Sequence, residues 1–457
     1  MDSLDGTMAH CVSKRDGHLW RPWIGVVAWL APCLAWCDPL KPGGDLTHSD
    51  WGSRAFAMPA PINDAQLLRD FNFGNRLFNT QWVPAPASAV AFDGLGPTFN
   101  RNSCSGCHVR DGRGRAPLGD EPLTMVIRWH HADGRPLANY GHQLNDRAIA
   151  GVPAEARLNV EWESMTVRMG DGELVTLRRP QFRLSDPAFG PLPRDLRWSA
   201  RVAPAVFGLG LIEAVDPLLV ARGADPFDQD RDGISGELHA TRQGIGRFGW
   251  KAAVPSLRAQ ATEAALSDIG LTSFEHPNEN CPAIQAGCRA ATNGGSPELD
   301  EKSVDKLVRY LQVLGVPPRR DPRSPTVVRG EAVFHQLGCA GCHTPTLRTA
   351  ASGVPPFLAD QVFHPYTNLL RHDMGALLAD PAQSDRKEGR EWRTPPLWGM
   401  GLIPAVNGHQ QLLHDGRAAG VAEAVLWHDG EARAARERFR HAPKPDRDAL
   451  VAFVNDL

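Results

Sequence analysis

The sequence has little excess charge of either sign. Its 457 residues include 49 Lys and Arg against 52 Asp and Glu, which gives a net charge of -3 at pH 7. This near balance excludes the strongly basic footprint that is typical of nucleic-acid-binding proteins, so we expect no nucleic-acid partner. Long apolar runs are also scarce. The run over residues 23–36 is short for a membrane span of ~20 residues, and it contains Pro32.

The N-terminal region instead has the parts of a secretory signal. A basic segment precedes the apolar run, and the small residues Ala35 and Cys37 stand just before Asp38, where we expect cleavage. The basic residues are Lys14, Arg15 and Arg21. We predict a signal peptide over residues 1–37, which leaves a periplasmic or otherwise exported protein with no membrane span after cleavage. An uncleaved membrane anchor and a lipid attached at Cys37 are the alternatives.

Cysteine is scarce, with nine residues in the chain. Three of these fall in or before the predicted signal: Cys11, Cys33 and Cys37. Cys281 and Cys288 lie close together in a loop rich in Pro, Gly and Asn. An oxidising compartment favours a local disulfide between them over two free thiols. The four remaining cysteines form two short motifs, and they are Cys104, Cys107, Cys339 and Cys342.

Both motifs have the pattern Cys-x-x-Cys-His, at residues 104–108 and 339–343. This pattern is the attachment signal of a c-type haem, in which two thiols bond the two vinyl groups of one porphyrin. The imidazoles of His108 and His343 would then bind the iron as proximal ligands. A redox dithiol or a zinc site is the alternative, but two distant copies, each followed at once by His, favour haem. The sequence therefore predicts two covalently bound haem c groups.

Helical periodicity recurs at corresponding places around the two motifs. Apolar residues at helical spacing occupy one segment directly before each motif and one segment well after it. The four segments are residues 64–79, 304–314, 327–337 and 446–457. We therefore predict a mainly α fold with two cytochrome c-like haem domains, at residues 38–316 and 326–457. The Pro-rich residues 317–325 would link them.

A long insert and an internal repeat lie between and after the motifs. Residues 159–168 and 173–184 are rich in β-forming residues and flank a Gly-Asp-Gly turn, which predicts a β-hairpin within the first domain. We expect this hairpin to form a wall of the first haem pocket. Residues 201–215 match residues 393–406 with one gap, and both segments follow a haem motif. The repeat indicates two related haem domains.

Several motifs together carry a resemblance to a known family. They are residues 104–114, 208–213, 230–236, 246–252, 392–396 and 413–417. From about residue 64 to its end, the chain resembles the di-haem oxidoreductases related to bacterial di-haem cytochrome c peroxidases. Within that superfamily it looks most similar to the large peroxidase and thiol oxidoreductase branch. These motifs specify the family but not a substrate.

The resemblance implies a peroxidase-like enzyme. The C-terminal haem would accept electrons from a small donor protein of the cytochrome c or cupredoxin type. It would pass them to the N-terminal haem, where hydrogen peroxide or a similar oxidant is reduced. One alternative is a non-enzymatic electron-transfer cytochrome with both irons six-coordinate. The other is an oxidase that acts on a thiol or protein substrate.

The sixth iron ligands would decide between these functions. In the family, the distal ligand of the second haem follows a motif that matches residues 414–417 of this chain, so we expect His428 to be that ligand. Met374 is the rival ligand. The alternative for either residue is that it lines the pocket without binding the iron. For the first haem, the sequence indicates no sixth iron ligand, although four residues lie near enough to the motif along the chain to be candidates. They are Met125, His130, His131 and His142. We therefore expect a low-spin second haem and an open first haem.

Two further residues are candidates for the chemistry. An open first iron needs an acid–base group to move a proton between peroxide oxygens, and Glu213, which follows the first copy of the repeat, is our candidate. A surface glutamate is the alternative. Trp250, in the family block at residues 246–252, is expected between the haems as an electron carrier, with core packing as the alternative.

An acidic loop predicts a calcium site. Asp228, Asp230 and Asp232 stand at alternate positions before a Gly and copy the first half of an EF-hand loop. The twelfth position is His239 where the EF-hand has Glu, so we expect calcium in an irregular loop. A solvated acidic turn is the alternative.

Overall fold

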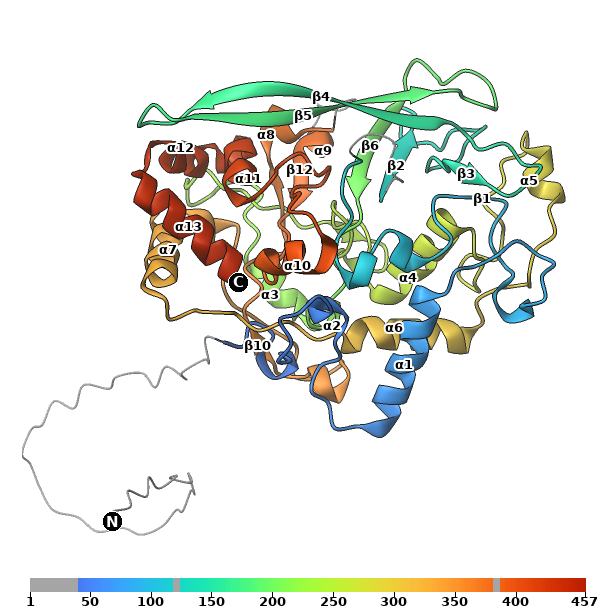
Figure 1. Cartoon of the computed structure of the whole chain (residues 1–457), viewed down its shortest axis with the longest axis horizontal. Coiled ribbons are helices and arrows are strands. Elements are labelled where there is room, and N and C mark those ends of the chain that lie inside the picture. Colours follow the sequence, from blue (N-terminus) through green and yellow to red (C-terminus); the bar gives the residue numbers. More distant parts are fainter. Residues whose placement is uncertain (1–39, 118–123, 381–386) are drawn as a thin grey trace, which may run out of the picture. The chain divides into compact units, whose positions relative to one another are not determined.

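Each Cys-x-x-Cys-His motif follows a helix that packs across a later helix of the chain. The computed structural model describes residues 40–117, 124–380 and 387–457. Helix α1 (Ala65–Asn79) packs on α6 (Glu301–Val313), and α7 (Pro325–Gln336) packs on α13 (Lys444–Asp456) (Figure 1). The four predicted helices are thus confirmed to within three residues at either end. Asp64 starts α1 because its side chain accepts hydrogen bonds from the Gln66 and Leu67 amides.

The two helix pairs cross at equivalent glycines. A Cβ added at Gly74 of α1 would collide with the Lys306 carbonyl and the Tyr310 side chain of α6. One added at Gly330 of α7 would collide with the carbonyl of Ala449 and the side chain of Phe453 in α13. Four residues after each glycine stands a phenylalanine. Its ring contacts the aromatic residue that a Cβ on that glycine would meet. These contacts are Phe78 with Tyr310, at 5.4 Å between ring centroids, and Phe334 with Phe453, also at 5.4 Å.

The fold is mixed rather than mainly α, which corrects the prediction. Helix accounts for 34% of the residues and strand for 17%, and every strand in the described ranges belongs to a two-stranded antiparallel sheet. The paired strands are β1 (Thr98–Phe99) with β3 (Arg147–Ala148), β2 (Met125–His130) with β6 (Arg197–Val202), β4 (Arg157–Arg168) with β5 (Leu174–Ser185), β7 (Ala240–Thr241) with β8 (Gly244–Ile245), β9 (Leu347–Arg348) with β10 (Val362–Phe363), and β11 (Arg371–Asp373) with β12 (Glu391–Arg393).

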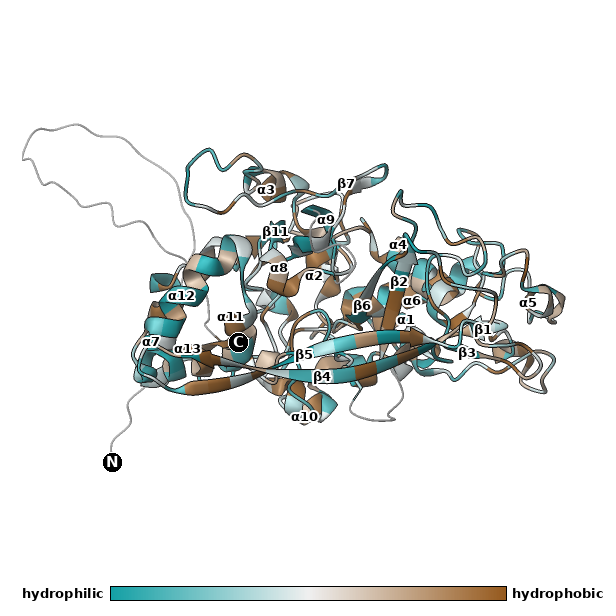
Figure 2. Cartoon of the chain, turned by 90° about the horizontal axis from the view of Figure 1, so that it is seen from above, coloured by the Kyte–Doolittle hydropathy of each residue, from teal (hydrophilic) through white to brown (hydrophobic). Residues whose placement is uncertain are grey.

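The long hairpin β4–β5 is confirmed, but its predicted role is wrong. Exposed and partly buried residues alternate along most of β4, as expected for a strand with one solvated face. Hydrophilic and hydrophobic residues follow one another along β4 and β5 (Figure 2). The turn reaches the C-terminal helices: the Gly170 amide donates to the Arg440 carbonyl at 2.8 Å. The buried Arg447 donates to Asp171 at 2.8 Å and to Glu173 at 2.7 Å. These contacts hold the tip against α12 and α13, and no hairpin residue lines the cavity at the first motif.

The remaining helices are short. They are α2 (Leu209–Ala214), α3 (Pro217–Arg222), α4 (Leu257–Ala264), α5 (Ala286–Ala290), α8 (Gly375–Leu378), α9 (Lys387–Arg390), α10 (Ile403–Asn407), α11 (Val421–Trp427) and α12 (Arg433–His441). No helix in the described parts of the chain is long and apolar enough to cross a bilayer. The predicted signal peptide lies outside the described residues.

The largest hydrophobic core draws side chains from both predicted domains. It includes Phe71 of α1 and Phe334 of α7, and the described residues belong to one compact unit. A second core surrounds the β2–β6 sheet and includes Trp129, Trp250 and Trp392. The division into two haem domains stays a prediction, and the two similar helix pairs agree with it.

Candidate haem-binding sites

The two Cys-x-x-Cys-His motifs have the same local conformation. In each motif the first three residues form a 3₁₀ turn, over Cys104–Gly106 and Cys339–Gly341. The amide of His108 donates to the Cys104 carbonyl, and that of His343 to the Cys339 carbonyl, both at 3.0 Å. The four motif cysteines are not bonded to one another. Both pairs of thiols are therefore available for the same covalent attachment.

Each motif histidine is oriented by a backbone carbonyl. Nδ1 of His108 lies 2.7 Å from the Pro204 carbonyl, and Nδ1 of His343 lies 2.9 Å from the Tyr366 carbonyl. Because a carbonyl can only accept, Nδ1 carries the proton in both rings and Nε2 keeps its lone pair. Burial lowers the pKa of both histidines to about 4, so both rings are neutral. A neutral imidazole with a free Nε2 is the form that binds haem iron.

Each histidine opens onto a cavity whose walls are built alike. The first cavity has a volume of about 740 Å³ and the second of about 250 Å³. Both are lined by the motif cysteines and histidine, by the phenylalanine of the preceding helix and by two side chains of the crossing helix. The lining residues that correspond are Phe78, Leu307 and Leu311 in the first cavity and Phe334, Leu450 and Val454 in the second.

The wall shared by the two cavities also fits haem. Arg393 lines both cavities and is only 8% exposed, yet its guanidinium bonds only the carbonyls of Gly249 and Thr394. No carboxylate among the described residues pairs with it, and burial lowers its pKa to about 10. An unpaired buried cation is costly. The carboxylate side chains of a haem would neutralise it.

Both predicted ligands of the second iron line the second cavity. Nδ1 of His428, at the C-terminal end of α11, lies 2.6 Å from the Ala424 carbonyl. This bond orients the ring and leaves Nε2 available, as in His343. Burial lowers the pKa of His428, so the ring is neutral. Met374, directly before α8, lines the same cavity. The choice between the two ligands stays open.

The first cavity is the more polar of the two. Four of its side chains have a buried polar atom with no hydrogen-bond partner in the described structure. These atoms are Arg101 Nη2, Trp129 Nε1, Gln143 Oε1 and Gln260 Oε1. In the second cavity, only Arg113 Nε is of this kind within the same described ranges. Orphaned donors and acceptors at a cavity wall indicate a polar occupant.

Three of the four residues in sequence reach of the first iron line the first cavity. They are Met125, His130 and His142. His131 does not line it; Nδ1 of His131 instead lies 3.0 Å from Asp195. Lining the cavity does not make any of them a ligand, so the open first iron stays a prediction.

Glu213, the predicted acid–base group, does not line either cavity. One oxygen accepts from the Leu257 amide at the start of α4, and the other accepts from Gln312 of α6, both at 2.8 Å. In the first copy of the repeat, the Pro204 carbonyl orients the His108 ring. Glu213 follows later in the same copy, and its contacts join α4 to α6.

Trp250 lines both cavities, and Arg393 is the only other described residue that does so. The indole N–H donates to the Val202 carbonyl at 2.8 Å, and Arg113 lies over the ring at 5.7 Å from its centroid. The location agrees with the predicted place of Trp250 between the haems.

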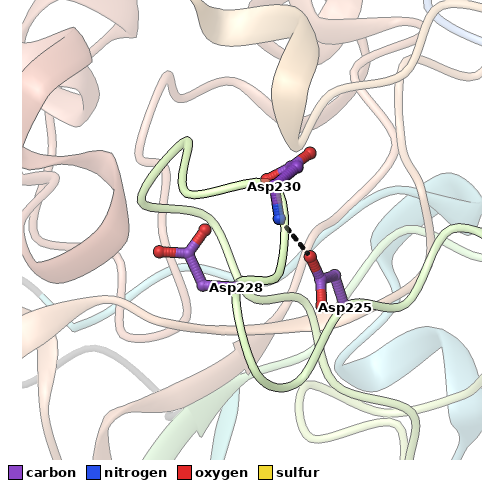
Figure 3. A group of neighbouring side chains, drawn as sticks. All are labelled: Asp225, Asp228 and Asp230. Atoms are coloured by element: carbon purple, nitrogen blue, oxygen red, sulfur yellow. Dashed lines mark hydrogen bonds between the residues drawn. The ribbon is translucent and has the colours of Figure 1, made fainter.

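The acidic loop groups a different set of carboxylates from the predicted one. Oxygen atoms of Asp225, Asp228 and Asp230 lie within 4.8 Å of one another (Figure 3). Asp232 is not in this group; it accepts from the Ile234 amide at 2.8 Å and lines the second cavity. Calcium binding stays a prediction, now with Asp225 in the place of Asp232.

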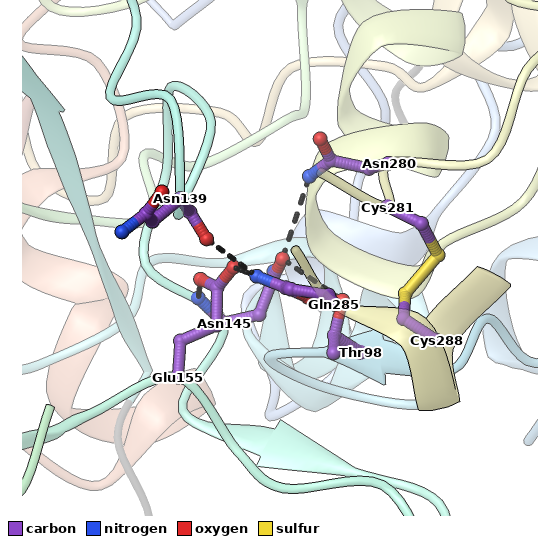
Figure 4. The surroundings of a disulfide bond; sticks show 8 residues. All are labelled: Thr98, Asn139, Asn145, Glu155, Asn280, Cys281, Gln285 and Cys288. Carbon is purple, nitrogen blue, oxygen red and sulfur yellow. Dashed lines mark hydrogen bonds between the residues drawn. A yellow bond between two sulfur atoms is a disulfide. The ribbon is translucent and has the colours of Figure 1, made fainter. Parts of the chain in front are cut away.

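The disulfide between Cys281 and Cys288 is confirmed, with 5.6 Å between the Cα atoms. It closes a loop whose Gln285 donates to the buried carboxylate of Glu155 at 2.7 Å (Figure 4). Next to the disulfide, Asn280 donates to Asn145 at 3.4 Å and lines the first cavity. Asn280 therefore connects this loop to the wall of the cavity, while Glu155 and Gln285 lie behind that wall and do not line it.

Sequence reasoning missed the polar residues of the first cavity. Trp129, Gln143 and Asp268 come from distant segments, and none belongs to a recognisable motif. Arg393 stood inside the repeat, but nothing in its neighbourhood indicated that it would be buried without an acidic partner.

Comparison with known proteins supports the two-site arrangement. A family model described as "Di-haem oxidoreductase, putative peroxidase" matches residues 36–127 and 136–457. No curated protein sequence matches the chain. A solved chain of hydrazine synthase from Kuenenia stuttgartiensis is similar at 12% identity, with a TM-score of 0.35, covering 99% of this chain and 100% of that chain. A similarity this low assigns neither fold nor activity.

Proposed function

Because the chain belongs to the di-haem oxidoreductase family, we propose that it is an exported peroxidase. It takes electrons from a small donor protein of the cytochrome c or cupredoxin type at its C-terminal haem centre. Hydrogen peroxide or a similar oxidant is reduced at the N-terminal centre. Cys104, Cys107 and His108 hold the N-terminal haem, and their counterparts at residues 339, 342 and 343 hold the other. A haem bound there supplies redox-active iron that binds a small oxidant where its sixth position is open.

The observation that carries this proposal is the difference between the two cavities. The first is larger and presents unpartnered polar atoms, among them Trp129 Nε1 and Gln143 Oε1, to its occupant. The second is smaller and contains His428, whose ring is already oriented for a metal bond. A polar cavity suits a small oxidant that needs hydrogen bonds. A smaller cavity that contains a ligand for the iron suits electron transfer.

The wall between the cavities supports a direct electron route. Trp250 reaches both cavities, and Arg113 and Arg393 flank it. We propose that Trp250 conducts electrons between the centres. Arg113 and Arg393 are both buried, and they would hold the carboxylates of a bound haem next to Trp250.

Spectroscopy of the purified protein tests the proposal. Electron paramagnetic resonance and resonance Raman spectra should show a low-spin second haem. They should also show a first haem that is high-spin, at least after one-electron reduction, and that reacts with hydrogen peroxide. If both irons are low-spin in the oxidised and half-reduced states, and peroxide changes neither spectrum, the protein is an electron carrier. Turnover of a thiol substrate without reaction with peroxide would favour the oxidase.

A further inference from the structure

Two carboxyl groups in the described residues line the first cavity, and only one of them forms a salt bridge. Glu263 forms an ion pair with Arg128 at 3.0 Å, and 37% of its side chain is exposed. Asp268 makes no described salt bridge. Its Oδ1 instead accepts a hydrogen bond from the neutral amide of Gln143 at 2.7 Å. Arg128 pairs directly with Glu263, whereas it acts on Asp268 only through its charge and forms no described salt bridge with it. The Asp268 carboxyl group therefore keeps its capacity to take up and release a proton.

The backbone delivers Asp268 to the cavity through an irregular turn. Residues Ala265–Ile269 continue α4 as a π-helix, the only one in the described ranges. Leu266, Ser267 and Asp268 line the cavity in succession. A regular α-helix would not present three consecutive residues to one surface, and π-helical turns are frequent at functional sites. The Asp268 carbonyl accepts from the amides of Asn100 and Arg101, at 2.8 and 3.1 Å, which holds this turn in place.

Gln143 fixes the direction of the carboxyl group. Its Nε2 donates to three oxygens: Asp268 Oδ1, the Ser267 carbonyl and Asn100 Oδ1, at 2.7 to 3.0 Å. Because all three partners are acceptors, the amide orientation is determined. The other amide atom, Oε1, is buried without a partner in the described structure. A donor group in the cavity would satisfy it.

From this geometry we propose that Asp268 is the catalytic acid–base group of the first haem centre, and that Gln143 is its positioning residue. The inference rests on the proposed peroxidase function and assigns the proton transfer to Asp268 where the sequence pointed to Glu213. Desolvation raises the pKa of Asp268, which favours return of a proton once the carboxyl group has taken it up.

The reduction of one hydrogen peroxide molecule to two water molecules balances with two electrons from the donor protein and two protons from solvent. The Asp268 carboxylate takes the proton from one oxygen of hydrogen peroxide and returns it to the other oxygen. The O–O bond then breaks, and the doubly protonated oxygen leaves as water. The remaining oxygen receives two electrons, which the donor protein supplies, and two protons from solvent, and leaves as a second water. The carboxyl group ends in its starting state.

The substitution Asp268→Asn tests the assignment on the full-length protein with both haems attached. Asparagine keeps an oxygen for the Gln143 amide but cannot exchange a proton. We expect the second-order rate constant for reaction with peroxide, measured by stopped-flow absorbance, to fall at least ~100-fold. Haem content and the low-spin spectrum of the second centre should not change. Glu155→Gln is the matched control, because Glu155 is a buried carboxyl in the adjoining network that does not line the cavity.

Two further variants make the result decisive. Asp268→Glu keeps an acid in the cavity and should recover at least ~10-fold over the Asn variant. Equal impairment of both variants would assign Asp268 a structural role and overturn the proposal, as would a wild-type rate in Asp268→Asn. Loss of reaction in Glu213→Gln but not in Asp268→Asn would return the assignment to Glu213. If the wild-type protein does not react with peroxide, the proposed function itself fails.

Discussion

Stability above neutral pH should depend on one buried carboxyl group, that of Glu155. The side chain is fully buried and accepts from the Asn145 amide at 2.8 Å and from Gln285 at 2.7 Å. No cation is among its described partners. Burial raises the pKa of Glu155 from 4.5 to about 8. The folded protein therefore holds a proton that the unfolded chain releases between these two pH values.

The sign and size of the effect follow from this shift. Because the folded state binds more protons between pH 4.5 and 8, the free energy of unfolding falls as the pH rises through that window. At about 1.4 kcal/mol per pKa unit, the loss from pH 5 to pH 8 is ~4 kcal/mol. Glu155→Gln removes the ionisation but disturbs one hydrogen bond, which costs about 1 kcal/mol. The variant should be slightly less stable than the wild type at pH 5 and ~3 kcal/mol more stable at pH 8.5.

Guanidinium unfolding of both proteins at pH 5 and pH 8.5, followed by tryptophan fluorescence and haem absorbance, measures this difference. The slopes with denaturant must agree between the two proteins for the comparison to hold. Glu161→Gln, on the exposed face of β4, controls for the loss of one carboxylate. A stability difference between wild type and Glu155→Gln that is the same at both pH values would refute the reasoning. It would mean that Glu155 ionises without cost in the folded protein.

Four other outcomes are expected. Denatured protein should retain two haems per chain through acid-acetone extraction; loss of haem into the extract would contradict covalent attachment. His428→Ala should abolish the low-spin signal of the second haem in electron paramagnetic resonance while Met374→Leu preserves it, and the opposite pattern would make Met374 the ligand. Gly330→Ala should lower the free energy of unfolding by about 1–3 kcal/mol in denaturant titration, because its Cβ meets the backbone of α13; an unchanged midpoint would mean that the helices separate freely. Calcium should raise the melting temperature, and Asp230→Asn should weaken that response; no response of the wild type to calcium or chelator would exclude the site.

The haem motifs, the helices around them and the disulfide could be predicted from the sequence because each depends on residues close together in the chain. Two thiols and an imidazole at fixed spacing can attach a haem wherever they occur, so residues 104–108 and 339–343 indicate the cofactor without any tertiary information. The four helices that frame the motifs were predicted for the same reason, since helical periodicity is a local property. The disulfide between Cys281 and Cys288 spans a loop short enough to close by itself.

The tertiary structure decided which side chains share a cavity, because that depends on contacts between distant segments. Gln143, which is bridged to Arg128 of β2, meets Asp268 only when its segment and the end of α4 pack against the same cavity. Glu213 looked like a catalytic residue from its place in the repeat, but its carboxylate accepts from Leu257 and Gln312 and lines neither cavity. The hairpin β4–β5 formed as predicted, because its alternation is local. Where its tip docks depended on Arg447 of α13, which the alternating pattern of the strands does not encode.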